Sequence, residues 1–196
     1  MMTHTHGIQL LVGLGNPGAE YEDTRHNAGF WWIDEVAASH SARLQLESKF
    51  SGHAGRVKLG DHEAWLLKPN TFMNASGRSV GAIAKFYKIP PEAILVIHDE
   101  LDLPPSGVKL KKGGGHGGHN GLKDIAAHLG TNDFWRLRLG IGHPGDRNAV
   151  VNFVLHAPSR DEMSLIQDNI DTSAHLLPML LAGQFEAAML KLHTKP

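Results

Sequence analysis

Residues 9–18 decide the fold, and they consist of Gln9-Leu10-Leu11-Val12 followed by Gly13-Leu14-Gly15-Asn16-Pro17-Gly18. The first four residues include a continuous apolar run, which is typical of a strand buried inside a sheet. The glycines and the proline that follow mark a tight turn. We therefore expect a buried strand over residues 9–12 that opens directly into a polar loop.

Predicted strands and helices alternate along the rest of the chain. The helical spacing of apolar residues predicts helices over 28–38, 80–87 and 122–129 and from Ser159 onward, with Ser159 as the N-cap. Apolar runs predict a hairpin over 56–67 and strands over 94–97, 108–111 and 136–141. This alternation predicts an α/β fold, a single domain with a twisted, mostly parallel, mixed sheet flanked by helices.

Length and composition exclude several classes of protein. At roughly 150 residues per domain, 196 residues correspond to about one domain, residues 1–196. With 41% apolar and 20% charged residues, the chain is neither disordered nor fibrous. No apolar run approaches the roughly 18 residues of a membrane span, and the N-terminus lacks the features of a signal peptide. The absence of cysteine excludes disulfides and cysteine nucleophiles and suits the cytoplasm, which is the expected location.

Charge is balanced over the whole chain but not locally. Lys and Arg number 19 against 20 Asp and Glu, a formal net charge of −1, so the chain is not a general binder of polyanions. Between residues 105 and 140, however, two acids accompany six basic residues: Lys109, Lys111, Lys112, Lys123, Arg136 and Arg138. An anionic partner would have to bind at such a local patch.

Three polar segments are expected at one edge of the sheet, because ligands of such sheets bind beyond the carboxyl ends of the strands. They are residues 13–18, the loop before Ser76, and His98-Asp99-Glu100. A histidine at a helix start, such as His26, is most often a cap or a solvated residue, but an imidazole can also act as a general base. His26 would then need a carboxylate to fix its tautomer, and Asp99 is the natural candidate.

Two short motifs indicate other enzyme classes only weakly. Residues 13–18 match G-x-G-x-x-G, the dinucleotide fingerprint, but Pro17-Gly18 forms a turn where that fingerprint needs a helix. Residues 77–81 match the nucleophile elbow G-x-S-x-G, but no strand precedes Ser79, which falls inside a predicted helix. A nucleotide-dependent oxidoreductase is therefore a minor alternative, and Ser79 is not an expected nucleophile.

The segment from Lys68 to Gly77 allows two interpretations. Asn74 or Ser76 could cap the following helix, with Phe72 or Met73 as a hydrophobic staple. Alternatively, an amide points into a site beside an apolar wall. The sequence leaves both open.

Residues 113–121 form a loop in which six of nine residues are glycine. Such a loop suits a mobile cover or a backbone that approaches a ligand closely, and it opens a helix whose N-terminus attracts anions. Lys109, Lys111 and Lys112 just upstream are a solvated charge run or, beside this loop, a phosphate clamp. His116 and His119 lack a third clear ligand, so we expect no metal site.

Together these motifs resemble those of the bacterial peptidyl-tRNA hydrolases. The matching segments are residues 13–18 with Tyr21, residues 24–30, 68–77, 98–102, 113–122 and 140–145. The resemblance extends from about Gln9 to the C-terminus, and residues 1–8 look like an N-terminal extension.

The resemblance implies hydrolysis of the ester between a peptide, or an N-blocked aminoacyl group, and the 3′-terminal ribose of tRNA, which frees the tRNA for translation. It implies that His26 is the catalytic base, Asp99 its partner and Asn16 a catalytic amide. The implied substrate-binding residues are Tyr21, Phe72, Met73, Asn74, His119 and Asn120, and the implied tRNA phosphate-binding residues are Lys109, Lys111 and Arg138.

The residues themselves are compatible with this reaction. A water polarised by His26 can attack an ester directly, and asparagine amides can bind the oxyanion, so neither a metal nor a cofactor is needed. The expected partner is the acceptor stem and 3′ CCA end of peptidyl-tRNA, with no membrane and no obligate protein partner, and we expect a monomer. The rival hypothesis is a non-catalytic RNA-binding module, which would use the basic segment but not His26 or Asp99.

Overall fold

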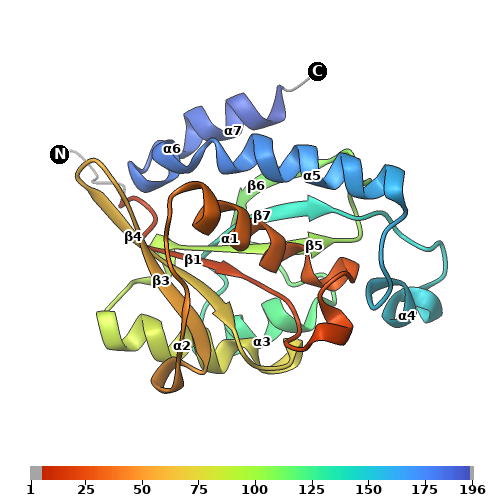
Figure 1. The fold of residues 1–196 in the computed structure, drawn as a ribbon, viewed down its shortest axis with the longest axis horizontal. Helices are drawn as coiled ribbons and strands as arrows, with labels where there is room; N and C mark the ends of the chain where they lie inside the picture. Colours follow the sequence, from red (N-terminus) through yellow and green to blue (C-terminus); the bar gives the residue numbers. More distant parts are fainter. Residues whose placement is uncertain (1–5, 195–196) are drawn as a thin grey trace.

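A seven-stranded mixed sheet forms the centre of the computed structural model, which describes residues 6–194 (Figure 1). The strands are β1 (Leu10–Gly13), β2 (Gln45–Glu47), β3 (Gly52–Leu59), β4 (His62–Pro69), β5 (Ile94–Glu100), β6 (Val108–Lys112) and β7 (Trp135–Gly140). Their order in the sheet is β2-β3-β4-β1-β5-β7-β6. Residues far apart in the sequence therefore meet beside the central strand β1.

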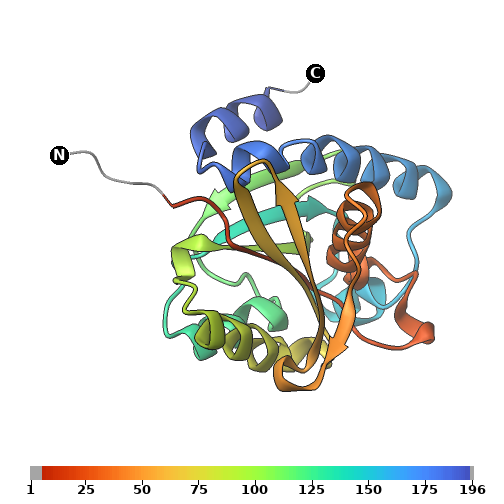
Figure 2. The ribbon, with the colours of Figure 1, turned by 60° about the vertical axis from the view of Figure 1, so that its left-hand side comes forward.

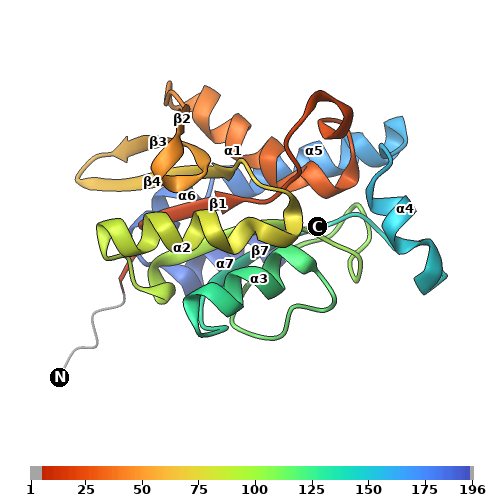
Figure 3. The ribbon, with the colours of Figure 1, turned by 90° about the horizontal axis from the view of Figure 1, so that it is seen from below.

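Helices cover both faces of this sheet, which Figures 2 and 3 show from two further directions. The α-helices are α1 (Ala28–Ser39), α2 (Ser76–Tyr87), α3 (Asn120–Leu129), α4 (Val150–Val154), α5 (Arg160–Ala174), α6 (Leu177–Leu181) and α7 (Phe185–His193). Short 3-10 helices are η1 (Ala19–Tyr21), η2 (Arg25–Asn27), η3 (Ser48–Phe50), η4 (Met73–Ala75), η5 (Pro91–Ala93) and η6 (Arg147–Ala149). Helices α2 and α3 lie on one face, and α1 and α5 to α7 pack on the other.

Strand β1 separates two hydrophobic cores. Leu11 belongs to the core under α1 and α5, whereas Leu10 and Val12 belong to the core under α2 and α3. All three side chains are fully buried. Because side chains of a strand alternate between its faces, a strand covered on both sides has to be apolar at every position. The predicted buried strand at residues 9–12 is therefore confirmed, shifted by one residue.

The mixed α/β sheet is confirmed, and its parallel part is the centre. Strands β4, β1, β5 and β7 run parallel, while β2 and β3 on one side and β6 on the other are antiparallel additions. The carboxyl ends of the four parallel strands consequently open at the same edge, where the loops after Gly13, Pro69, Glu100 and Gly140 meet. The polar segments that we expected at one edge of the sheet, residues 13–18, the loop before Ser76 and residues 98–100, lie at this edge.

Of the two interpretations of residues 68–77, the cap of helix α2 by Asn74 or Ser76 is wrong. Its N-cap residue is Ala75, which has no capping side chain, so neither Asn74 nor Ser76 fills this role. Instead, the Asp124 carboxylate on α3 accepts a hydrogen bond from the backbone N–H of Gly77 at 2.7 Å. Ser79 is fully buried within α2, and η4 rather than a strand precedes this helix, which rules out the elbow geometry.

The cap of helix α5 is confirmed. Ser159 Oγ accepts a hydrogen bond from the N–H of Glu162 at 3.2 Å, and Glu162 Oε1 accepts one from the N–H of Ser159 at 2.8 Å. This reciprocal pair is a capping box, which satisfies two backbone donors at the helix start. The start of α5 is thereby fixed by its own sequence.

At the N-terminus, residues 1–5 of the expected extension lie outside the described part of the chain. Ile8 is buried in the core, and its N–H donates to Leu180 O at 2.9 Å. Among residues 6–194, none of the helices has both the length and the apolar character needed to cross a bilayer.

Replacing either of two helical glycines by alanine should change the free energy of unfolding, but in opposite directions. A Cβ on Gly29 in α1 would lie 2.4 Å from Ile97 O and from Leu14 N, which are backbone atoms that cannot move aside. We expect Gly29→Ala to lower the free energy of unfolding by about 2 kcal/mol or more through overpacking. A Cβ on Gly81 in α2 would come no closer than 3.5 Å, to His128 Cβ, so Gly81→Ala should raise it by up to about 1 kcal/mol. Urea unfolding checks both, and equal effects would contradict this packing.

Candidate active site

The turn η2 before helix α1 carries three consecutive side chains, Arg25, His26 and Asn27, that reach different parts of the molecule. Asn27 is buried and binds the backbone of Asn16 twice. Its Oδ1 accepts from Asn16 N at 2.8 Å, and its Nδ2 donates to Asn16 O at 3.0 Å. This side chain therefore fixes the loop after β1 against the start of α1.

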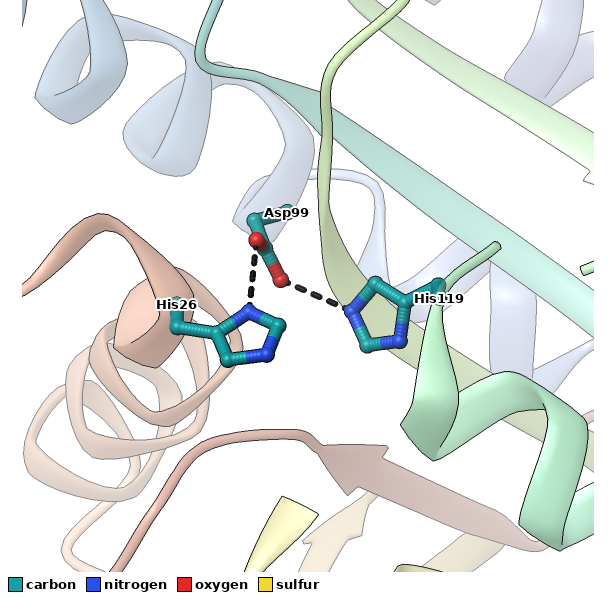
Figure 4. A group of neighbouring side chains, drawn as sticks. All are labelled: His26, Asp99 and His119. Carbon is teal, nitrogen blue, oxygen red and sulfur yellow. Dashed lines mark hydrogen bonds and ion pairs between the residues drawn. The ribbon is translucent and has the colours of Figure 1, made fainter. Parts of the chain in front are cut away.

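Asp99, near the carboxyl end of β5, lies between two histidines (Figure 4). Asp99 Oδ2 is 2.8 Å from His26 Nδ1, and Asp99 Oδ1 is 2.8 Å from His119 Nε2. Only 2% of the Asp99 side chain is exposed, against 15% for His26. The structure thus brings His26 and Asp99 together as expected, and it adds His119, which the resemblance placed among the substrate-binding residues.

The protonation of this group follows from the buried carboxylate. Burial alone would raise the pKa of Asp99, but the two histidines outweigh it and hold this pKa well below its usual range. An ionised carboxylate only accepts hydrogen bonds, so His26 Nδ1 carries a proton and donates it to Asp99. The opposite nitrogen, Nε2, then bears the lone pair, and no side chain in residues 6–194 is hydrogen-bonded to it.

The same carboxylate stabilises the charged form of His26. Burial lowers the pKa of this imidazole, but the charge of Asp99 and its hydrogen bond raise it, and the net result is a pKa above the ordinary value. His26 can therefore accept a proton at Nε2 while Asp99 compensates the positive charge that forms. This is the chemistry of a general base with an orienting acid.

His119 connects Asp99 to the start of helix α3. Its Nε2 donates to Asp99, which leaves Nδ1 as an acceptor. Nδ1 accepts from the N–H groups of Gly121 and Leu122, at 3.1 and 3.4 Å, and His119 is the N-cap residue of α3. Both ring nitrogens are thus engaged, and each contact requires the same neutral tautomer.

Within residues 6–194, the ligand atoms of His26, Asp99 and His119 also lie close enough to one another to suggest a metal site. The two N···O distances of 2.8 Å argue against it. Ligand atoms bound tetrahedrally to zinc at about 2.0 Å lie about 3.3 Å apart, so these distances are those of hydrogen bonds rather than of shared coordination. Of the two histidines considered from the sequence, His116 is not in this group. The geometry fits a hydrogen-bonded group and not a metal centre.

A cavity of about 280 Å³ lies next to this group. Eight of the residues that line it were candidates from the sequence: Asn16, His26, Phe72, Met73, Asn74, Asp99, His119 and Asn120. Tyr21 is not among the lining residues, but its ring lies edge-on to Phe72 with the centroids 6.3 Å apart. The cavity is close to the lower end of the size range for ligand pockets.

The three candidate asparagines differ in how firmly they are held. Asn16 is 7% exposed, and its Oδ1 accepts from the N–H of Met73 at 2.7 Å. This contact orients the amide and leaves its NH₂ group as the available donor. Asn74 and Asn120 are exposed. Only Asn16 is therefore preorganised by the protein.

A second, basic cavity of about 260 Å³ adjoins the first, and both are lined by His98, Glu100, His116 and Gly117. Lys111, Arg136 and Arg138 contribute its positive charge. Arg138 Nε donates to Glu100 Oε1 at 2.8 Å. Arg136 donates to the carbonyls of Gly114 and Gly115 and so holds the glycine loop.

The structure separates the two candidate lysines of β6. Lys111 lines the basic cavity, but Lys109 does not. The charge of Lys109 instead affects His193 of α7. Burial is the main reason why the pKa of His193 is lowered, and the charge of Lys109 lowers it further. Both lysines are exposed on the same face of β6. Their tertiary surroundings, not their position along the strand, distinguish them.

Several residues of the site were not identified from the sequence. Arg25 and Asn27 lie within a matched motif but received no role, and Arg136 was counted only as part of the basic segment. Val151, on α4, lines the main cavity although no element was predicted there. The sequence carried no signal for them, because the burial of Asn27 and its bonds to Asn16 exist only in the folded chain.

Fold and site together define an α/β protein of the hydrolase type, with a hydrogen-bonded histidine–aspartate pair at the carboxyl edge of its sheet. The chain belongs to the peptidyl-tRNA hydrolase family, whose sequence model matches residues 10–196. It is 70% identical over 190 residues to the peptidyl-tRNA hydrolase of Methylobacillus flagellatus, covering 97% of this chain and 98% of that protein. Identity to the enzyme of Neisseria meningitidis serogroup C is 58% over 188 residues, with 96% and 98% covered. The crystal structure of peptidyl-tRNA hydrolase from Acinetobacter baumannii superposes with a TM-score of 0.95 at 47% identity, covering 98% of each chain.

Titration of His26 tests the electrostatics of the site. We expect its pKa, followed by NMR of the imidazole protons, to lie above the ordinary value of histidine because of Asp99. Asp99→Asn should bring it below that value, since burial then acts without the opposing charge. Glu100→Gln, a neighbouring carboxylate bonded to Arg138 rather than to His26, is the matched control. An unchanged titration in Asp99→Asn would contradict the arrangement.

Proposed function

We propose that the protein hydrolyses the ester between the peptide and the 3′-terminal ribose of peptidyl-tRNA, with a water molecule activated by His26. Nε2 of His26 takes a proton from the water as the water oxygen bonds to the carbonyl carbon. When the tetrahedral intermediate breaks down, the same proton moves to the departing ribose oxygen. The products are a free carboxylic acid and a tRNA with its 3′-hydroxyl. The pairing of His26 with buried Asp99 is the observation that carries this proposal.

Asn16 is the best-placed group to stabilise the developing oxyanion. Its Oδ1 accepts from Met73 N, so the side-chain NH₂ group stays free to donate, and Asn16 lines the main cavity. A fixed donor of this kind stabilises charge in the transition state more than a flexible one, because no reorganisation is needed. Asn74 and Asn120, which are exposed, would bind other polar groups of the substrate.

The apolar side of the main cavity would receive the peptide. Phe72 and Met73 lie on one side, and Val151 and Leu155 come from the α4 region. Phe72 is 60% exposed and Val151 70%, so the wall is open to solvent. An open apolar wall makes few specific hydrogen bonds, which suits a substrate whose peptide sequence varies.

The basic cavity would bind a phosphate of the tRNA acceptor end. Lys111 and Arg138 lie there, next to the cavity that holds His26, and phosphate is the group that all tRNAs share. The acceptor stem and the 3′ CCA end are thus the parts of the substrate that the protein would contact. Translation produces this substrate, so we place the reaction in the cytoplasm, without a membrane or an obligate protein partner.

The two alternative functions lack a use for the observed site. An RNA-binding module has no need for a buried base–acid pair. A dinucleotide enzyme would need the loop after Gly13 to open into a helix, but η1 and η2 intervene before α1.

Replacing the base should remove turnover without unfolding the protein. We expect His26→Ala to lower kcat for N-acetyl-aminoacyl-tRNA roughly 10²–10⁴-fold, the usual contribution of a general base. The variant should still fold, with a lowered thermal transition because one oxygen of buried Asp99 loses its donor. The assay measures release of the acyl group, with and without EDTA. His62→Ala, an exposed histidine of β4, is the control and should behave as the wild type. Full turnover by His26→Ala would refute the proposed mechanism.

The two lysines of β6 provide a matched test of phosphate binding. Lys111→Ala should raise KM and reduce its dependence on salt concentration by about one phosphate contact. Lys109→Ala, which removes the same charge from outside the basic cavity, should have the smaller effect. Measuring KM between 50 and 200 mM salt separates the variants. Identical salt slopes for both variants and the wild type would exclude a phosphate clamp at Lys111.

A further inference from the structure

Arg25 precedes the proposed catalytic base and is bonded to the α4 segment, other residues of which line the main cavity. Its Nη1 donates to the carbonyl oxygens of Phe153, at 2.9 Å, and His156, at 3.3 Å. Its guanidinium carbon lies 3.9 Å from the centre of the Phe153 ring. Its backbone N–H donates to His156 O at 3.0 Å. Four contacts therefore join η2 to the segment that contains α4.

Helix α4 depends on tertiary contacts such as these for its stability. It has five residues, and a helix this short is unstable by itself because nucleation is costly. Val154 is buried, but Val151 is 70% exposed and Leu155 is 36% exposed. Figure 1 shows α4 at the end of the molecule, in the connection from β7 to α5. Arg25 donates hydrogen bonds to two carbonyl groups at the end of this helix, the region where a helix leaves acceptors unsatisfied.

Arg25 also contacts Glu162, a residue of α5 that is held in place by the capping box. Its Nη2 lies 3.3 Å from Glu162 Oε1, and the same oxygen accepts from Ser159 N in the capping box of α5. The Arg25 side chain is only 10% exposed. A planar guanidinium can bind two carbonyls and a carboxylate while it stacks on a ring, which a lysine ammonium cannot do. The chemistry of this position is therefore specific to arginine.

We propose that Arg25 is a positioning residue that holds the α4 wall, Val151 and Leu155, at the active-site cavity and thereby sets affinity for apolar acyl groups. This inference rests on the proposed function, in which that wall receives the peptide. Arg25 does not touch the reacting atoms. It acts through the position of α4, while His26, its neighbour in η2, acts through Asp99. One turn of the chain thus places both the base and the surface that binds the acyl group.

The test uses one tRNA that carries either N-acetyl-leucine or N-acetyl-glycine. In Arg25→Lys we expect KM for the leucyl substrate to rise roughly tenfold, as for loss of a contact in an apolar pocket, with kcat changed less than about twofold. KM for the glycyl substrate should stay within about twofold, because it has no side chain to contact the wall. Arg160→Lys, the same change at an exposed position of α5, is the matched control and should leave both substrates unaffected.

A purely structural role would give a different pattern. It would lower thermal stability and the amount of active enzyme, and so reduce kcat for both substrates while the ratio of their KM values stayed constant. That result would overturn the proposal. The outcome is independent of the His26 mechanism, because the ratio of KM values can be measured whichever group activates the water, whereas His26→Ala tests the mechanism alone.

A second variant keeps the proposal testable if Arg25→Lys does not fold. Phe153→Leu removes the ring under the guanidinium but keeps both carbonyl acceptors and the apolar character. We expect a smaller rise in KM for the leucyl substrate and faster amide hydrogen exchange confined to residues 150–156. Exchange in α1 should stay at the wild-type rate. Unchanged exchange in residues 150–156, together with an unchanged KM ratio, would show that the contact of Arg25 with the Phe153 ring does not hold α4, and would contradict the proposal.

Discussion

The buried carboxylate of Asp99 is the constraint on which the rest of the site depends. A charged group in the interior costs several kcal/mol unless each oxygen finds a donor. Here both oxygens do, one from His26 and one from His119. Each histidine is thereby fixed in a single tautomer, with opposite consequences. His26 keeps its lone pair for the cavity, while His119 uses its lone pair to begin helix α3. The ionisation of one side chain thus determines both the tautomer of His26 and the start of a helix.

The three side chains of the turn η2 hold the segments that surround the site. Asn27 holds the loop after β1, His26 binds the strand β5, and Arg25 holds the segment from α4 to α5. These segments are separated by 11, 73 and 128 residues in the sequence. The close packing of α1 on the sheet makes the turn a fixed platform, because Gly29 leaves no gap between α1 and strands β1 and β5. Disturbing the platform would therefore affect the base and the cavity wall together.

The sequence predicted the parts of the structure that depend on local pattern. The apolar run of β1, the helix at α1 and the cap at Ser159 each follow from residues adjacent in the chain, and each is present. The cap of α3 was not predictable, because a histidine caps this helix only when a distant carboxylate fixes its tautomer. Likewise, Lys109 and Lys111 share one face of β6, and only contacts made after folding distinguish them. The role of Arg25 depends on backbone carbonyls more than a hundred residues away, which leave no periodic signal.

The site divides into a rigid half and an open half, and this division accounts for how one enzyme can act on many substrates. Asp99, His26 and Asn16 are buried or largely buried and bonded from several elements, so the groups assigned to the chemistry are preorganised. Phe72, Val151, Asn74 and Asn120 are exposed and lie where the variable peptide would bind. An open apolar surface discriminates weakly between side chains, because a lost methylene costs only about 1–3 kcal/mol. Selectivity would then have to come from the constant part of the substrate, the phosphate, which the neighbouring basic cavity is charged to receive. With a net charge of −1 over the whole chain, there is no overall excess of positive charge that would retain a released tRNA.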